Sequence, residues 1–147
     1  MKKLLCLTLV IVMTVCALSS CALMEKIVMH ILENAESPDK VDEMMAALAD
    51  DRIDDAKALM HPDVTEDVIG DSLEALATYL DGRIMLSKQV TSLSVKKNRK
   101  KSSKVLEEHI SYDITLSDES VITVETIYIS DENGAGFTTF RFALGVT

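Results

Sequence analysis

Residues 106–116 read LEEHISYDITL, and this stretch decides the class of the fold. Large apolar residues recur at alternate positions, and polar residues separate them. A period of two is typical of a β-strand that buries one face and exposes the other. The apolar positions are Leu106, Ile110, Tyr112, Ile114 and Leu116; the intervening polar positions include Glu107, His109, Ser111, Asp113 and Thr115. The pattern predicts a strand over 106–116.

Three neighbouring stretches also have strand character. VITVETIYI, residues 121–129, is β-branched and nearly apolar throughout, as expected of a central strand. FTTFRFALGV at 137–146 alternates, and IMLSKQVTSLSV at 84–95 is a first strand with a bulge near Thr91. The segments LSDES and SDENGAG between them are rich in Asp, Asn, Ser and Gly, which indicates turns.

The first half of the chain has helical periodicity instead. Residues 23–35 form one expected helix, and a second begins at Ser37-Pro38-Asp39, where serine can cap and proline suits the first turn. A short helix follows from residue 50 or 51 and ends before Pro62, because proline disfavours helix at the preceding residue. A further helix is predicted over about 72–81, with Gly82 just beyond its end.

Helices followed by about four antiparallel strands predict an α+β fold, with the helices packed on one face of a curved sheet. This order, together with DDAKALMHPDV at 54–64, resembles the NTF2-like, cystatin-like superfamily, and in particular small lipoproteins of Gram-positive bacteria. The resemblance covers about residues 38–145 and implies a cone-shaped domain. The superfamily includes isomerase-like and cyclase-like enzymes and members that only bind or assemble, but no residue here matches a catalytic motif.

The N-terminus has the layout of an export signal. Lys2 and Lys3 precede an uncharged, largely apolar run from residue 4 to 18. Leu18-Ser19-Ser20-Cys21 then resembles the lipobox of bacterial lipoproteins. The resemblance implies a signal peptide at 1–20, lipidation of Cys21, a lipid-proximal helix or linker at 21–36, and a domain at 37–147 on the extracytoplasmic face of the cell membrane. An ordinary N-terminal anchor helix is the alternative.

The negative net charge of the chain limits the classes of partner that it can bind. The chain of 147 residues has a net charge of −9, which argues against general nucleic-acid binding. Residues 21–82 hold 16 acidic and 4 basic residues, whereas residues 83–147 hold 8 acidic and 9 basic ones. After cleavage Cys21 is the only cysteine, so an intramolecular disulfide is excluded and a single domain must rely on packing.

One set of side chains has the composition of a proton-transfer site. His109 and Asp113 share a face of the predicted strand, and Tyr79, Tyr128 and Arg141 are candidates to approach it in a cone-shaped domain. A solvent-facing side of the strand explains the same alternation. We expect no metal site and no cofactor, since the three histidines lack helical spacing, and since a calcium loop at Asp131 would need an acidic ligand where Phe142 stands.

The most unusual stretch is KKNRKKSSK at 96–104, which is expected to form a protruding hairpin loop. Its basic residues are Lys96, Lys97, Arg99, Lys100, Lys101 and Lys104. A solvated loop is one interpretation, and contact with anionic lipid headgroups or wall polymers is the other.

These observations lead to three hypotheses of function. The first is a membrane-anchored, non-catalytic domain that binds a small ligand or an envelope protein, with a homodimer left open. The second is a small-molecule enzyme of the isomerase or cyclase type. The third is a structural envelope protein held to anionic polymer or lipid by the basic stretch. An open pocket with converging His109, Asp113 and a tyrosine favours the enzyme, and a filled cone favours the other two.

Overall fold

A computed structural model describes residues 26–64, 66–100 and 103–144, with the backbone alone at 66–68, 98–100, 103–104 and 144. The chain divides into two compact units, Met1–Ala35 and Glu36–Thr147. In the first unit, residues 26–33 are helical, which agrees with the helix expected over 23–35. None of the helices in the described ranges has the length and apolar character needed to cross a membrane.

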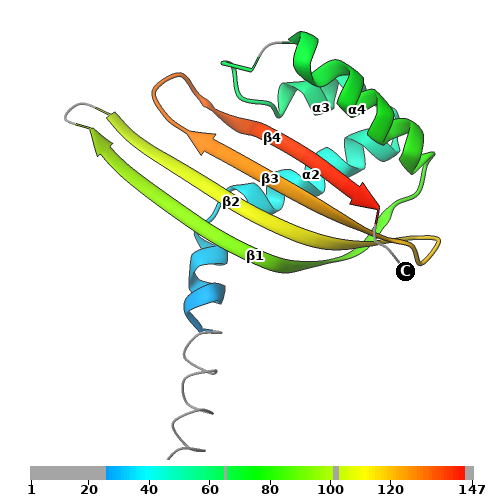
Figure 1. Cartoon of the computed structure of the whole chain (residues 1–147), viewed down its shortest axis with the longest axis horizontal. Coiled ribbons are helices and arrows are strands. Elements are labelled where there is room, and N and C mark those ends of the chain that lie inside the picture. Colours follow the sequence, from blue (N-terminus) through cyan, green and yellow to red (C-terminus); the bar gives the residue numbers. More distant parts are fainter. Residues whose placement is uncertain (1–25, 65, 101–102, 145–147) are drawn as a thin grey trace, which may run out of the picture. The chain divides into compact units, whose positions relative to one another are not determined.

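The second unit consists of helices followed by a four-stranded antiparallel sheet (Figure 1). The helices are α2 (Ser37–Ala49), α3 (Ile53–Ala58) and α4 (Glu66–Leu80). The strands are β1 (Met85–Lys100), β2 (Ser103–Leu116), β3 (Val121–Ser130) and β4 (Ala135–Leu144), and they lie in chain order. The predicted α+β class is therefore confirmed, and the sheet is open rather than closed into a barrel.

The strand registers follow the sequence pattern closely. β1 and β2 pair from Met85↔Leu116 to Lys100↔Ser103, and the register shifts between Val90 and Ser92. The bulge predicted near Thr91 is thus confirmed. The basic stretch is different from expectation: residues 96–100 and 103–104 continue the two strands rather than forming a loop, because their backbones stay paired.

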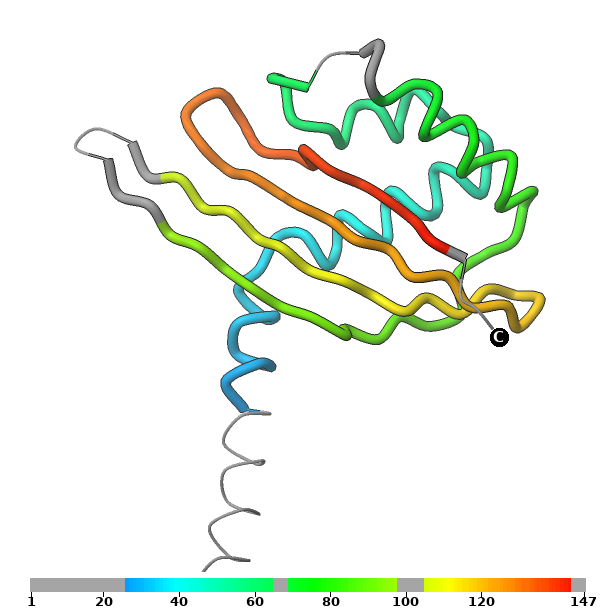
Figure 2. The backbone as a smooth tube through the Cα atoms, viewed as in Figure 1, coloured from blue at the N-terminus to red at the C-terminus, as the bar shows by residue number. Residues whose placement is uncertain are grey.

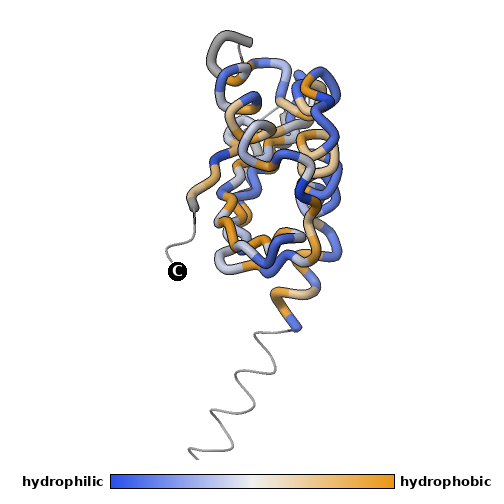
Figure 3. The backbone as a smooth tube through the Cα atoms, turned by 90° about the vertical axis from the view of Figure 1, so that its right-hand side faces the viewer, coloured by the Kyte–Doolittle hydropathy of each residue, from blue (hydrophilic) through white to orange (hydrophobic). Residues whose placement is uncertain are grey.

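Alternation along the strands separates an inner from an outer face of the sheet. The helices lie against the inner face, and Figure 3 shows hydrophobic residues recurring along the strands and helices that enclose the core. On β2 and β3, alternate residues from Ile110 to Leu116 and from Ile122 to Tyr128 are buried. The largest fully buried apolar side chains are Tyr112, Phe137, Met44, Leu48, Leu73, Leu76, Leu80, Ile110, Ile114, Leu116 and Ile122.

The longest helix, α4, begins earlier than the sequence suggested. It starts at Glu66 rather than near residue 72, so Gly70 lies within it despite the low helix propensity of glycine. Packing of its apolar side, which includes the buried Leu73 and Leu76, outweighs that local preference. At the other end, the prediction for Gly82 is confirmed. Gly82 lies two residues after Leu80, the last helical residue, and its φ is +75°.

The core assignment predicts a large effect of truncating Leu76, which is 1 % exposed. Leu76→Ala should lower the free energy of unfolding by about 2–5 kcal/mol, because it removes buried methyl groups and leaves a cavity. Phe142→Ala should cost less, since Phe142 is only half-buried against Tyr79. Chemical denaturation measures both, with the exposed Glu74→Ala on the same helix as control. A loss below about 0.5 kcal/mol for Leu76→Ala, the size typical of surface changes, would contradict the assignment.

Candidate functional site

The five residues predicted to surround a pocket lie on two sides of the sheet. His109, Asp113 and Arg141 alternate with buried neighbours, so their side chains occupy the outer face, away from the helices. Tyr128 is buried on the inner face, and Tyr79 belongs to α4 on the same side. The sheet therefore separates the two tyrosines from the other three candidates, and the expected convergence does not occur.

The outer face carries an open hollow of about 340 Å³ near the middle of the sheet. Glu125 and Arg141 are paired in register there, and both side chains are exposed. The side chains around the hollow are mainly polar and include Ser92, His109, Ser111, Glu125, Ile127, Thr139 and Arg141. An open polar surface of this kind suits an exposed partner better than a substrate that must be sequestered from water.

Two of the outer-face candidates are engaged in interactions within the sheet. The His109 imidazole Nε2 is hydrogen-bonded to Glu107, and the Lys96 ammonium lies 3.6 Å from the same carboxylate. This hydrogen bond from His109, aided by the charge of Lys96, holds the pKa of Glu107 below its usual value. Asp113 accepts a hydrogen bond of 2.8 Å from the Thr123 hydroxyl. The Lys96–Glu107 and Thr123–Asp113 contacts therefore join neighbouring strands, whereas the His109–Glu107 hydrogen bond lies within β2.

A buried carboxylate joins the inner face of the sheet to α2. Glu108 is only 1 % exposed, and its two oxygens accept hydrogen bonds from the backbone N–H of Ser37 at 3.0 Å and of Glu36 at 3.3 Å. Amides at a helix N-terminus have no partner within the helix, and the helix dipole favours a negative charge there. The sequence predicts Ser37 as the cap, but its hydroxyl has no hydrogen-bond partner among the described residues, and the carboxylate from β2 caps the helix instead.

Two tyrosines lie beside this joint. The Tyr128 hydroxyl donates to the Glu36 carboxylate at 3.3 Å, whereas the hydroxyls of Tyr112 and Ser37 have no partner in the described part of the chain. Burial raises the pKa of Tyr112 to about 12. Burial, followed by the charge of Glu36, raises the pKa of Tyr128 to about 12. Both phenols stay protonated at neutral pH, and Glu108 is engaged by the helix, so the cluster is a structural joint.

Glu108 was missed in the sequence, although a signal was present. The inner positions of β2 are the even-numbered ones, and position 108 falls among them, between Leu106 and Ile110. An acidic residue in an otherwise apolar alternation must find polar partners when it is buried. That reasoning predicts a buried carboxylate, but it cannot identify the α2 amides as the partners.

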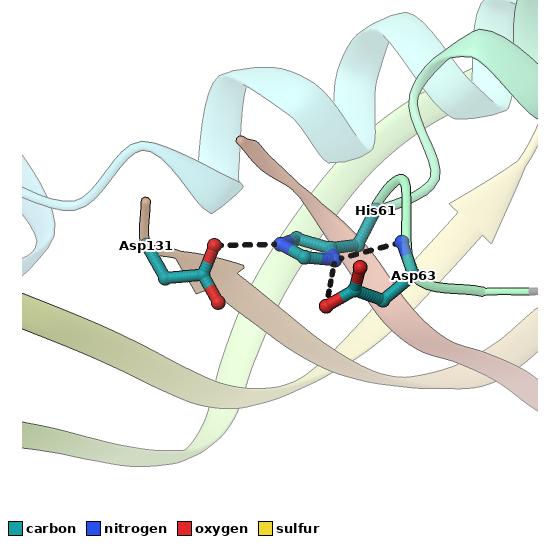
Figure 4. A group of neighbouring side chains, drawn as sticks. All are labelled: His61, Asp63 and Asp131. Carbon is teal, nitrogen blue, oxygen red and sulfur yellow. Dashed lines mark hydrogen bonds and ion pairs between the residues drawn. The ribbon is translucent and has the colours of Figure 1, made fainter. Parts of the chain in front are cut away.

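A second cluster surrounds His61, which is buried just after α3 (Figure 4). Its Nε2 lies 3.3 Å from the Asp131 carboxylate, and its Nδ1 accepts the backbone N–H of Asp63 at 3.2 Å. Asn133 donates its backbone N–H to Asp131 at 2.8 Å and its side-chain amide to Asp63 at 3.2 Å. The hydrogen bond from the backbone N–H of Asn133, and then the one with His61, hold the pKa of Asp131 below its usual value.

This cluster has the donor atoms of a metal site but not the arrangement. Ligand atoms of His61, Asp63 and Asp131 lie within 4.8 Å of one another. Figure 4 shows the two carboxylates at opposite edges of the imidazole ring, and each ring nitrogen already has a partner. A metal ion needs one ring nitrogen and the carboxylates converging on a single point. The three residues therefore form a clasp between the α3–α4 connection and the β3–β4 turn.

The clasp continues along the edge of β4. His61 donates its backbone N–H to the carbonyl of Phe137 at 2.9 Å, and Phe137 donates to the carbonyl of Leu59 at 3.0 Å. Met60 and Phe137 form the corresponding parallel bridge. A Cβ atom at Gly136 would lie 2.6 Å from the backbone of Met60 and of His61, so only glycine permits this approach. The α3–α4 connection thereby covers part of an otherwise open strand edge.

The basic stretch lies at the free end of the β1–β2 hairpin. Lys96 and Lys97 are on β1 with exposed side chains. Arg99, Lys100 and Lys104 occupy paired strand positions, with Arg99 opposite Lys104, while Lys101 lies outside the described residues. The predicted lipidation residue, Cys21, also lies outside them. We refer to residues 96–104 as the basic arm.

Comparison with known proteins finds no matching family model, no matching curated protein and no matching solved structure.

The joint at Glu108 predicts a stability loss when its carboxylate is removed. Glu108→Ala should lower the free energy of unfolding by about 1–3 kcal/mol, because the buried amide of Ser37 loses its acceptor. Glu108→Gln should cost less, since one oxygen remains to accept a hydrogen bond. Urea denaturation compares these variants with Glu107→Ala, the neighbouring carboxylate on the outer face. Equal losses at positions 107 and 108 would argue against a cap.

Two glycines give a matched test of the clasp. Gly136→Ala should destabilise the protein by about 1–3 kcal/mol, because the added methyl group collides with the backbone of His61. Gly70→Ala should instead stabilise it by about 0.5–1 kcal/mol, since open space surrounds that helical position. Thermal unfolding of both variants measures the difference, and a Gly136→Ala variant as stable as wild type would rule out the close approach.

Proposed function

We propose that this chain is an exported lipoprotein whose Glu36–Thr147 unit is a non-catalytic binding domain, tethered to the outer face of the cell membrane through Cys21. The support for this cellular location comes from the sequence alone. Two lysines precede an uncharged run, and Leu18-Ser19-Ser20-Cys21 follows it. A protein held by a diacylglyceryl group and a further acyl chain stays on the bilayer, because each additional buried CH₂ strengthens the attachment.

The observation that carries the binding role is the filled inner side of the sheet. Tyr112, Phe137 and Leu76 are at most 1 % exposed, and such side chains fill the space between the sheet and the helices. The polar groups proposed for proton transfer are divided between the two faces of the sheet. Both facts favour a binding domain over the isomerase or cyclase alternative.

The outer face is the best-supported place for that binding. It combines exposed Glu125 and Arg141 with hydroxyl side chains around an open hollow of about 340 Å³. Among the described residues, neither Glu125 nor Arg141 forms an ion pair or a side-chain hydrogen bond. A polar ligand or a protein surface with both charges is the partner that this arrangement suits.

The tether is tested by changing the two neighbouring cysteines separately. Cys21→Ala should abolish lipid attachment and release the processed protein from membranes, because no thiol remains for the diacylglyceryl group. Cys16→Ala should have no effect, since Cys16 lies in the segment predicted to be removed. Membrane fractionation after alkaline washing, with mass spectrometry of the mature N-terminus, distinguishes the two. Unmodified Cys21 in the wild-type protein would refute the proposed anchor.

A further inference from the structure

We propose that the hollow on the outer face of the sheet is a binding site for a free α-amino acid with a neutral polar side chain. The inference rests on the proposed binding role of the outer face, and it adds the chemical class of the ligand. Its basis is a pair of opposite charges that lack partners, set among side chains that are too short to fill the space beside them.

The charged pair lies in the middle of the outer face. Glu125 on β3 and Arg141 on β4 are paired in register, so their backbones are held about 4.8 Å apart. Both side chains are exposed, and neither forms an ion pair or a side-chain hydrogen bond with a residue that the structure describes. The Glu107 and Asp113 carboxylates on the same face already have partners. Glu125 and Arg141 are therefore available to bind one cationic and one anionic group side by side.

An α-amino acid carries those two groups on a single carbon atom. A guanidinium donates two parallel hydrogen bonds to a carboxylate, and this fixed geometry makes arginine the preferred side chain for recognising that group. The Glu125 carboxylate accepts hydrogen bonds from an ammonium group, which offers three donors. Thr139, which lies beside Arg141 on the same face of β4, adds a hydroxyl to the lining of the hollow. One small zwitterion thus satisfies both unpaired charges.

The remaining part of the hollow determines which amino-acid side chain fits. Ser111 on β2 is in register with Glu125, and Ser92 on β1 is in register with Ser111, so this row crosses the four strands that lie side by side in Figure 2. Neither serine hydroxyl has a hydrogen-bond partner in the described ranges, and a hydroxyl can both donate and accept. The row offers these hydroxyls but no second unpaired charge, which favours a neutral polar side chain on the ligand.

The shape of the hollow favours a small ligand over a second copy of the chain. Three short side chains, those of Ser92, Ser111 and Thr139, leave about 340 Å³ open near the middle of the sheet. A second copy would set an equal hollow against this one, and atoms that line a void lose their dispersion contacts. Ile127, half-buried and in register with Thr139, supplies apolar surface for the carbon atoms of the ligand. The open side suits a ligand that is bound and released without being transformed.

The test uses the isotope-labelled mature lipoprotein in detergent micelles, with L-glutamine as the probe. Nuclear magnetic resonance titration should shift the backbone amides of Ser111, Glu125 and Arg141 most strongly. Two matched compounds each lack one charge, since L-glutamine α-amide has no carboxylate and N-acetyl-L-glutamine has no ammonium. Each should bind about tenfold more weakly than L-glutamine, because a hydrogen bond to a charged group contributes about that factor.

Matched protein variants identify which residue binds which charge. Arg141→Gln should weaken L-glutamine about tenfold but leave L-glutamine α-amide unchanged, because that compound has no carboxylate for the guanidinium to bind. Glu125→Gln should weaken L-glutamine to a similar extent and leave N-acetyl-L-glutamine unchanged. Glu132→Gln removes an exposed charge from the β3–β4 turn, outside the hollow, and should leave the binding of all three compounds as in wild type. Thermal unfolding of each variant checks that the fold is intact.

The failures are distinguishable. Equal binding of the three compounds would overturn the amino-acid assignment and keep the outer face as a polar binding site. If no compound shifts an amide at millimolar concentration, this inference is wrong, and a photo-crosslinking residue in place of Thr139 then tests the proposed function in growing cells. Capture of an envelope protein would assign the face to a protein surface and keep its binding role, whereas the absence of any adduct would overturn that role as well.

Discussion

The hydrogen bonds between the Glu108 carboxylate and the first amides of α2 are the interaction on which the rest of the unit depends. Burying a carboxylate is unfavourable unless its charge is compensated, and a helix N-terminus supplies both N–H donors and a favourable dipole. The requirement works in both directions, because the helix amides also need an acceptor. This mutual need sets where α2 crosses the sheet, which side chains the helix covers and where the N-terminal segment departs.

Once α2 is held there, the alternation of the strands gives the two faces of the sheet different roles. Val41, Met44 and Leu48 of α2 are buried, as are the inner residues of β2 and β3. The outer face keeps its charged and hydroxyl side chains accessible around the hollow. At the far edge, the His61 clasp ties the α3–α4 connection to β4 and to the β3–β4 turn. The unit therefore combines a filled interior with a polar exterior.

The distribution of charge gives this unit a direction. Acidic residues predominate in the helices, whereas the charged residues between positions 96 and 104 are all basic. In a chain tethered near an anionic surface, these two regions experience opposite forces. The arm is a poor contributor to the core, since its strands have no β3 partner beyond Leu106.

By itself, the sequence determined the α+β class, the order of the elements, the inner positions of the strands and the bulge near Thr91, because each of these depends on local periodicity and turn chemistry. Tertiary structure decided what local patterns cannot express: that α4 starts before Gly70, that Glu108 rather than Ser37 caps α2, and that the basic residues continue a hairpin. It also separated His109, Asp113 and Arg141 from Tyr79 and Tyr128. Adjacent strand residues point to opposite faces, but the strand pattern does not say on which side a residue from a distant helix, such as Tyr79 of α4, will pack.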